Sequence, residues 1–168
     1  MHIETDDLSR VQVRALLQEH LDNMYELSPP EQVFALDYSK LKVPEITVWT
    51  IWDDRQLLGC GALKELSLVH GEIKSMRTPN AARRKGAGRR ILQHIIAVAR
   101  HRGYKTLSLE TGSHPAFEAA HSLYLDHGFI VSRPFGTYIL DPHSVFMQLQ
   151  LGGIEVIEQS FVAGCRPR

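Results

Sequence analysis

Apolar residues recur with the period of a helix in several stretches of the chain. They return every three or four residues over 11–27, and the Ser-Pro-Pro run at 28–30 ends this pattern. They gather on one side of a predicted helix that runs from about residue 87 to residue 102. Residues 116–129 predict a third helix, and the ambiguous segment 31–43 is interpreted as a further one.

Between these helices, β-branched and aromatic residues form runs of the length that strands have. The runs are 46–52, 56–66, 72–78, 105–111 and 144–151. Residues 53–55 predict one tight turn and His70-Gly71 another, so the first three runs are expected to form an antiparallel meander. The first residues of the chain can add a short strand.

The order of strand, glycine-rich loop, helix and strand over residues 72–111 predicts a right-handed βαβ unit with parallel strands. The fold class is therefore α/β, with a central mixed, mostly antiparallel sheet flanked by helices. We expect residues 1–151 to form a single domain. Residues 152–168 read as a C-terminal tail with no clear place in that domain.

The composition excludes several classes of protein. Nineteen Lys and Arg balance nineteen Asp and Glu, so no overall field draws the chain to nucleic acid or to an anionic membrane. Cys60 and Cys165 lie far apart without ligand spacing, which predicts neither a disulfide framework nor a metal site. No signal-peptide pattern and no bilayer-length apolar run occur. We expect a cytoplasmic protein that binds no metal, no nucleic acid and no membrane.

One local charge cluster stands out against this neutral background. Residues 83–90, RRKGAGRR, lie between the strand 72–78 and the following helix. Backbone N–H groups at a helix start lack partners, the helix dipole adds positive charge there, and glycines allow close approach of a ligand. The segment is typical of a phosphate-binding loop, although a basic helix start without a ligand has the same composition.

The loop and a downstream motif together resemble the GNAT family of N-acetyltransferases. Arg83-x-x-Gly86-x-Gly88 resembles that family's acyl-CoA signature, [QR]xxGx[GA], and AHSLYLDHGF resembles its next motif. The matching residues of the second motif are Ala120, Leu123, Tyr124, Gly128 and Phe129. The resemblance covers roughly Ile46 to Leu151. It departs at Phe117, where the family often has an asparagine that binds the pantetheine arm.

The resemblance implies an acetyl-CoA-dependent N-acetyltransferase in which an amine attacks the thioester directly, in a ternary complex. Acetyl-CoA is then a co-substrate, and the acceptor is a small-molecule or protein amine. The residues that the resemblance assigns to acetyl-CoA are Met76, Arg77, Thr78, Arg83, Arg84, Lys85, Gly86, Ala87, Gly88 and Arg89. The first three would offer backbone groups to the pantetheine and the thioester carbonyl.

The catalytic candidates follow from the same resemblance. Tyr124 matches the family's tyrosine and would protonate the departing thiolate, while Glu72 stands where some members place a catalytic glutamate. Glu65 is the second candidate near the acceptor, and a water chain is the alternative to either carboxylate. A loop containing Phe135, Tyr138 and Asp141 is expected to hold the acceptor, its alternative being a purely structural hairpin with inward-packed aromatic rings.

Two rival functions remain open from the sequence. A non-catalytic acyl-CoA-binding regulatory module would use the same loop, and the departure at Phe117 favours it. A nucleic-acid-binding protein would use the basic cluster, but aromatic residues do not interleave with it. A homodimer is also an expectation from the family.

Overall fold

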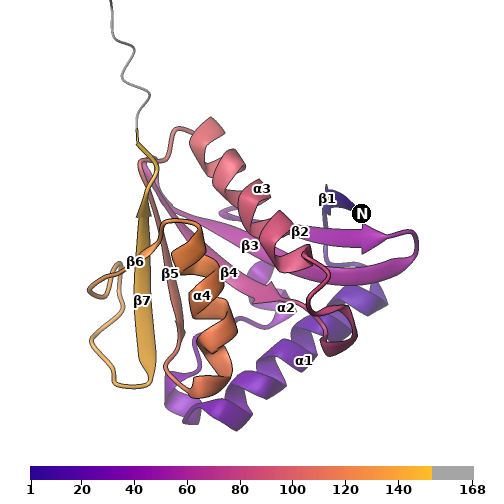
Figure 1. Cartoon of the computed structure of the whole chain (residues 1–168), viewed down its shortest axis with the longest axis horizontal. Coiled ribbons are helices and arrows are strands. Elements are labelled where there is room, and N and C mark those ends of the chain that lie inside the picture. Colours follow the sequence, from indigo (N-terminus) through magenta and orange to yellow (C-terminus); the bar gives the residue numbers. More distant parts are fainter. Residues whose placement is uncertain (153–168) are drawn as a thin grey trace, which may run out of the picture.

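Strands of one continuous sheet run through the computed structural model, which describes residues 1–152. Their order is β1-β2-β3-β4-β5-β7-β6, and every neighbouring pair is antiparallel except β4 and β5 (Figure 1). The strands are β1 (His2–Thr5), β2 (Ile46–Asp53), β3 (Gln56–Ser67), β4 (His70–Arg77), β5 (Thr106–Gly112), β6 (Ile130–Val131) and β7 (Ser144–Gln150). The predicted α/β fold, with a mixed and mostly antiparallel sheet and a parallel βαβ unit, is confirmed.

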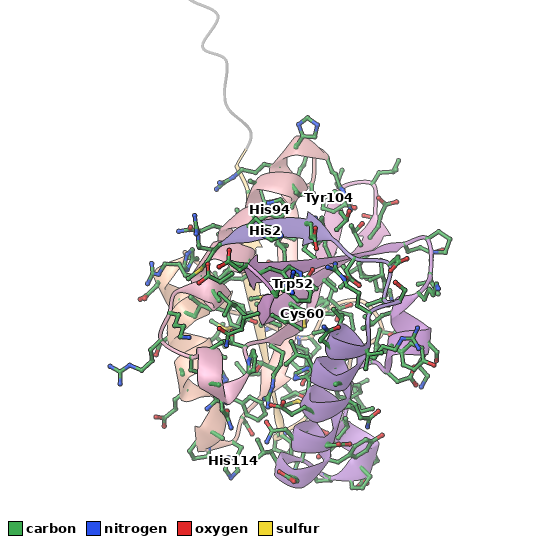
Figure 2. The ribbon with its side chains drawn as sticks, turned by 90° about the vertical axis from the view of Figure 1, so that its right-hand side faces the viewer. His2, Trp52, Cys60, His94, Tyr104 and His114 are labelled. Carbon is green, nitrogen blue, oxygen red and sulfur yellow. The ribbon has the colours of Figure 1, made fainter. Side chains whose placement is uncertain are left out.

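Helices cover both faces of this sheet. The helices are α1 (Val11–Leu27), α2 (Tyr38–Leu41), α3 (Ala87–His101) and α4 (Glu118–Asp126). Leu63 of β3 packs in the core cluster of α3 and α4, while its neighbour Ala62 packs in the cluster of α1. Since successive strand residues point to opposite faces, α1 lies on the face opposite α3 and α4. Cys60 and Trp52, both labelled in Figure 2, are buried in the cluster of α1.

The predicted helix over 31–43 is wrong. The structure has only a short 3-10 turn at Pro30–Gln32 and the four-residue helix Tyr38–Leu41 in this segment. Phe34 lies between these two elements, and its ring packs edge-on against that of Tyr138, with the ring centroids 5.1 Å apart. A tertiary contact overrides the local apolar pattern here.

The predicted turn at His70-Gly71 is also misplaced. The turn occupies Leu68 and Val69, and His70 already begins β4. Gly71 serves a close contact instead, since a Cβ atom there would lie 2.8 Å from the ring of Tyr104. The glycine is therefore explained by packing against an aromatic ring rather than by a change of chain direction.

The described residues end shortly after β7. The predicted tail, 152–168, lies outside them apart from Gly152. Within residues 1–152, none of the helices has the length and the apolar character needed to cross a membrane.

Candidate active site

The parallel strands β4 and β5 separate midway along their length. Their pairing ends at Ile73 and Leu109, whereas β4 continues to Arg77 and β5 to Gly112 (Figure 1). Beyond the last pair, the facing edges have no strand partner in the described part of the chain. Backbone groups there are free to bind a molecule that enters between the strands.

A bulge in β4 lies at this opening. The register with β3 shifts between the pairs Cys60–Arg77 and Ala62–Lys74, and Ser75 has a φ of 53°. A left-handed backbone is uncommon outside glycine, and a bulge changes the direction of the groups next to it. Ser75 is thereby placed in the wall of the opening.

A cavity of about 100 Å³ lies between the separated strands. Its walls come from the ends of β4 and β5, from α1 and the segment after it, and from α4 with the turn before it. The lining residues are His20, Met24, Ser28, Gln32, Val33, Phe34, Ala35, Ile73, Lys74, Ser75, Met76, Glu110, Thr111, Gly112, Phe117, Ala120 and Tyr124. The cavity thus lies where four separate stretches of the chain meet.

Three of these lining residues have buried polar atoms without a hydrogen-bond partner among residues 1–152. The atoms are His20 Nδ1, Gln32 Oε1 and Ser75 Oγ. Burial, reinforced by the charge of Arg77, lowers the pKa of His20 to about 4, so its ring is neutral at pH 7. Buried polar atoms are nearly always paired in folded proteins, so this concentration of unpaired ones indicates a ligand site.

The glycine loop ends next to this opening. Gly86 is the N-cap of α3 with a φ of 81°, and no side chain among residues 1–152 caps the helix. A Cβ at Gly86 would meet no atom of the described residues within 4 Å, so they leave the space in front of the helix start open. A Cβ at Gly88 would lie 3.5 Å from Oγ1 of Thr78, directly after β4. An uncapped helix start in open space, joined to the end of β4, fits the pyrophosphate of a CoA-type molecule.

The basic side chains around the loop differ in their pairing. Arg83, Arg84 and Lys85 are exposed and form no ion pair within the described residues, while Arg89 lies 3.4 Å from Asp126 of α4. Since the Arg89 pair is exposed, it contributes little to stability and leaves the guanidinium available to an anion.

The three residues predicted to offer backbone groups also lie at this opening. Met76 lines the cavity, and Thr78 faces the start of α3. The side chain of Arg77 points away to α1, where it pairs with Glu19 at 2.6 Å and with Asn23 at 3.1 Å. Arg77 therefore ties β4 to α1 through its side chain, while its backbone pairs with Cys60 of β3.

Tyr124 of α4 has a buried ring that packs edge-on against Phe129, at a centroid distance of 5.6 Å. Its hydroxyl forms no hydrogen bond within residues 1–152, and the residue lines the cavity. Burial raises the pKa of this phenol well above its ordinary value, so it stays protonated at neutral pH. A protonated phenol without a partner can donate to a molecule in the cavity.

Phe117, where the sequence departs from the family pattern, forms part of the cavity wall. Its ring lies directly over Gly112, where a Cβ would be only 2.2 Å away. Phe117 thus gives an apolar surface at the end of β5, where the family pattern has the side-chain amide of an asparagine. Gly112 is required for this contact.

Glu72 lies beside the cavity in a buried cluster with two donors. Its Oε1 accepts a hydrogen bond of 2.6 Å from the Tyr138 hydroxyl and one of 2.9 Å from Lys74 Nζ. Lys74 also donates to the Tyr138 oxygen at 3.0 Å. Tyr138 reaches β4 from the loop before β7, so the cluster joins that loop to the sheet.

Tyr138→Phe is expected to lower the free energy of unfolding by roughly 1.5–3 kcal/mol, because it removes a hydrogen bond to a buried carboxylate while keeping the ring. Chemical denaturation measures this change. Tyr25→Phe is the matched control, since Tyr25 is 51% exposed and a surface change should stay within about 0.5 kcal/mol. An equal effect of the two substitutions would contradict a stabilising role for the cluster.

Sequence reasoning missed Glu110. This residue of β5 lines the cavity, and its Oε1 accepts a hydrogen bond of 2.7 Å from Ser144. Its pKa is raised, chiefly by burial. The strand has polar residues at Thr106, Ser108 and Glu110, which alternate with Leu107 and Leu109, so the sequence places Glu110 on the polar face of β5. The separation of β4 from β5 beside Glu110 could not be seen in the sequence.

The predicted acceptor residues are only partly brought together. Asp141 accepts a hydrogen bond of 2.7 Å from Gln32, a cavity residue, and Tyr138 contacts Phe34. Phe135 is buried and packs on Phe146 and Tyr138, as the structural alternative for this loop expected.

The side chain of Glu65 points to the opposite face of the sheet from that of its neighbour Glu72, and it does not line the cavity. Its carboxylate accepts a hydrogen bond of 2.8 Å from the Tyr104 hydroxyl. Tyr104 belongs to the core cluster of α3, on the face opposite the Tyr138 loop. Figure 2 shows Tyr104 and His114 at opposite ends of the molecule, and His114 lines an open hollow next to the cavity. Glu65 therefore has a structural partner, and neither residue of this pair lines the cavity.

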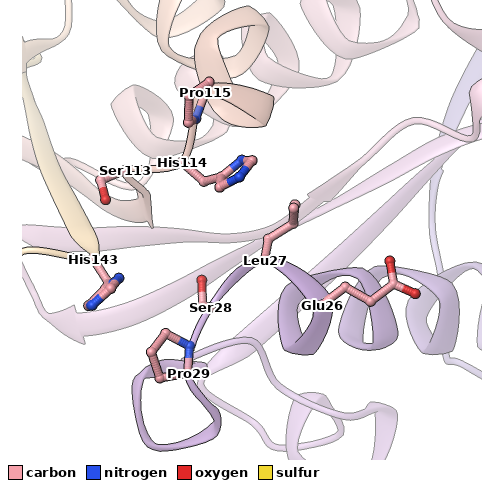
Figure 3. A pocket seen from close by; sticks show the side chains of 8 residues that line it. All are labelled: Glu26, Leu27, Ser28, Pro29, Ser113, His114, Pro115 and His143. Atoms are coloured by element: carbon pink, nitrogen blue, oxygen red, sulfur yellow. The ribbon is translucent and has the colours of Figure 1, made fainter.

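An open hollow of about 470 Å³ adjoins the cavity. It lies between the end of α1 and the loops after β5 and before β7, and Figure 3 shows Ser28, His114 and His143 around it. The hollow and the cavity thus share Ser28 in their walls.

Known proteins are similar to this chain in sequence and in fold. A model of the acetyltransferase (GNAT) family matches residues 13–129. The chain is 54% identical over 151 residues to Uncharacterized N-acetyltransferase YsnE of Bacillus subtilis, a match covering 90% of this chain and 100% of the relative. It is 50% identical over 149 residues to Uncharacterized N-acetyltransferase YedL of Escherichia coli, covering 89% and 94% of the two chains.

Among solved structures, a proposed acyl-CoA N-acyltransferase of Klebsiella pneumoniae has 28% sequence identity and a TM-score of 0.72, with coverage of 90% of this chain and 97% of the other. The family match and the similarity to these relatives and to the solved structure agree with one another. The chain belongs to the GNAT family of acetyltransferases.

Proposed function

We propose that the protein transfers the acetyl group of acetyl-CoA to a primary amine by direct attack within a ternary complex. One observation carries the proposal: the separated ends of β4 and β5 enclose a cavity with unpaired polar atoms, next to the uncapped start of α3. Membership of the acetyltransferase family supports it. The domain that carries this function is proposed to span residues 1–151.

The two ends of the site have different tasks. Acetyl-CoA supplies the thioester carbon that the amine attacks. The loop from Arg83 to Arg89 holds the pyrophosphate with backbone N–H groups and positive side chains. The free edge of β4 at Met76 gives backbone groups to the pantetheine and to the carbonyl oxygen, where negative charge develops during attack.

Tyr124 is proposed to donate a proton to the thiolate that leaves. Its buried, protonated phenol lines the same cavity as the free edge of β4. Removing the ring hydroxyl should therefore slow the chemical step without weakening the binding of acetyl-CoA.

The acceptor is proposed to enter from the open hollow next to Ser28 and to reach the cavity between Gln32 and Lys74. Polar and acidic groups gather there, including Glu110 and Asp141. This environment suits an amine, from a small molecule or from a protein. A homodimer and a cytoplasmic location stay predictions from the sequence.

The test is CoA release, followed with a thiol reagent, from acetyl-CoA mixed with the protein and one of a panel of primary amines. The panel contains an alkylamine, a polyamine, L-lysine and an aminoglycoside. We expect release that depends on the amine and saturates with both substrates. Release independent of every amine, or none at all, would contradict the proposal.

A further inference from the structure

Two glutamates from neighbouring strands lie on the same face of the sheet, beside the cavity. Glu72 of β4 is paired in register with Ser108 of β5, and Glu110 is two residues beyond Ser108. Side chains two residues apart on a strand share a face, so both carboxylates point toward the side covered by α1 and the Tyr138 loop. Their surroundings nevertheless differ.

The carboxylate of Glu72 has fixed partners. Tyr138 and Lys74 both donate to its Oε1, and its side chain is only 4% exposed. Taking a proton from an amine would weaken both of these hydrogen bonds. Glu72 is also absent from the lining of the cavity. These features fit a group that fixes the loop to the sheet.

The carboxylate of Glu110, unlike that of Glu72, has few fixed partners. It lines the cavity, and within residues 1–152 its only side-chain hydrogen bond is the one from Ser144 to Oε1. Its second carboxylate oxygen, Oε2, is therefore available to a ligand. The residue comes from β5 immediately after the pairing with β4 ends, so it stands at the edge of the opening.

The charges around Glu110 favour the uptake of a proton. Glu72 of β4 and Asp141 of the loop before β7 are negative and oppose its ionisation, while Lys74 of β4 and the Ser144 hydroxyl of β7 favour it. Burial has the largest effect, and the sum raises the pKa of Glu110 above its ordinary value. A carboxylate with a raised pKa is a stronger base than an ordinary glutamate.

Gln32 supplies the second contact that an amine needs. Its amide nitrogen donates to Asp141 at 2.7 Å, which fixes the direction of its oxygen. That oxygen, Oε1, is buried in the cavity wall without a partner in the described chain. It can accept one N–H of an amine and leave the nitrogen lone pair free for attack.

We propose that Glu110 is the catalytic base for the acceptor amine and that the side-chain oxygen of Gln32 holds the amine for attack. This inference rests on the proposed function. The ammonium gives one proton to Glu110, which passes it to solvent. The nitrogen lone pair then forms the C–N bond while the C–S bond of the thioester breaks. The nitrogen then loses a second proton, and the CoA sulfur takes up one proton, so the two balance.

The test compares Glu110→Gln with Glu72→Gln, two identical chemical changes on neighbouring strands. CoA release is measured against pH with two acceptors: an alkylamine, which is protonated at neutral pH, and hydroxylamine, which is not. In the parent, kcat/KM for the alkylamine should fall as pH drops through the raised pKa of Glu110, because the base becomes protonated.

Glu110→Gln is expected to lower kcat/KM for the alkylamine about 10²- to 10³-fold and to remove this acid limb. Hydroxylamine should lose less than about tenfold, since it needs no proton removed before attack. Glu72→Gln should keep the acid limb while lowering the midpoint of denaturation. Calorimetric titration with acetyl-CoA checks that each variant keeps the folded co-substrate site.

Each outcome of this experiment supports or overturns the role of Glu110. A Glu110→Gln variant that keeps the acid limb and the alkylamine rate overturns the role of Glu110, and so does an equal loss with both acceptors. A parent that releases no CoA with any amine contradicts the proposed function itself and removes the inference with it. Loss of the acid limb in Glu72→Gln alone would assign the base to Glu72.

Discussion

Gly86→Glu is expected to lower the affinity for acetyl-CoA at least 100-fold. The new carboxylate would stand at the start of α3, where no atom of the described residues lies within 4 Å of the Cβ position and where the pyrophosphate is proposed to bind. Two like charges 4 Å apart repel by about 4 kcal/mol near a protein surface, and each 1.4 kcal/mol is a factor of ten in affinity. Calorimetric titration with acetyl-CoA measures the change.

Gly103→Glu is the matched control for this experiment. Gly103 follows the other end of α3 with a φ of 79°, and a Cβ there also meets no atom within 4 Å. Both variants therefore carry the same side chain, the same charge and nearly the same backbone strain. We expect Gly103→Glu to bind acetyl-CoA like the parent. Equal affinities of the two variants would show that the pyrophosphate binds elsewhere.

Tyr124→Phe is expected to lower kcat by roughly 10²-fold with an unchanged affinity for acetyl-CoA. The substitution keeps the ring that packs on Phe129 and removes only the hydroxyl that would protonate the thiolate. Steady-state kinetics with saturating amine separates kcat from KM, since an interaction made only in the transition state affects kcat and kcat/KM equally.

The control is a second buried tyrosine. The hydroxyl of Tyr104 bonds to Glu65 on the face of α3, away from the cavity. Tyr104→Phe removes a buried hydroxyl in the same way and should lower stability while leaving kcat within about twofold, an effect below 1 kcal/mol. A parent-like kcat in Tyr124→Phe would show that the thiolate takes its proton from another group.

The parts of the site that could be predicted from the sequence are those built by local structure. The glycine loop and α3 are contiguous, so Gly86 and Gly88 reveal a helix start open to an anion without any tertiary knowledge. Tyr124 lies in a helix that Gly128 terminates, and its motif has a fixed spacing. The parallel βαβ unit could be predicted for the same reason, because its strands and helix follow one another directly in the sequence.

The acceptor side depends on contacts between distant segments, and there the sequence was insufficient. Gln32 meets Asp141 across more than a hundred residues of chain. Glu110 faces a cavity only because β4 and β5 separate beside it, and strand propensities do not encode where a pairing ends. Glu65 shows the converse. It carries a carboxylate and lies on the strand next to the predicted site, but its side chain is on the other face of the sheet, where it accepts a hydrogen bond from Tyr104.

The most direct test of direct acetyl transfer uses acetyl-CoA labelled with ¹³C in the acetyl group. Mass spectrometry after incubation with the protein and an accepted amine detects the label on the amine, on the protein or as acetate. We predict labelled N-acetyl amine, no stable label on the protein, and loss of the product in Gly86→Glu. Label accumulating on the protein, with ping-pong kinetics, would contradict the ternary-complex account.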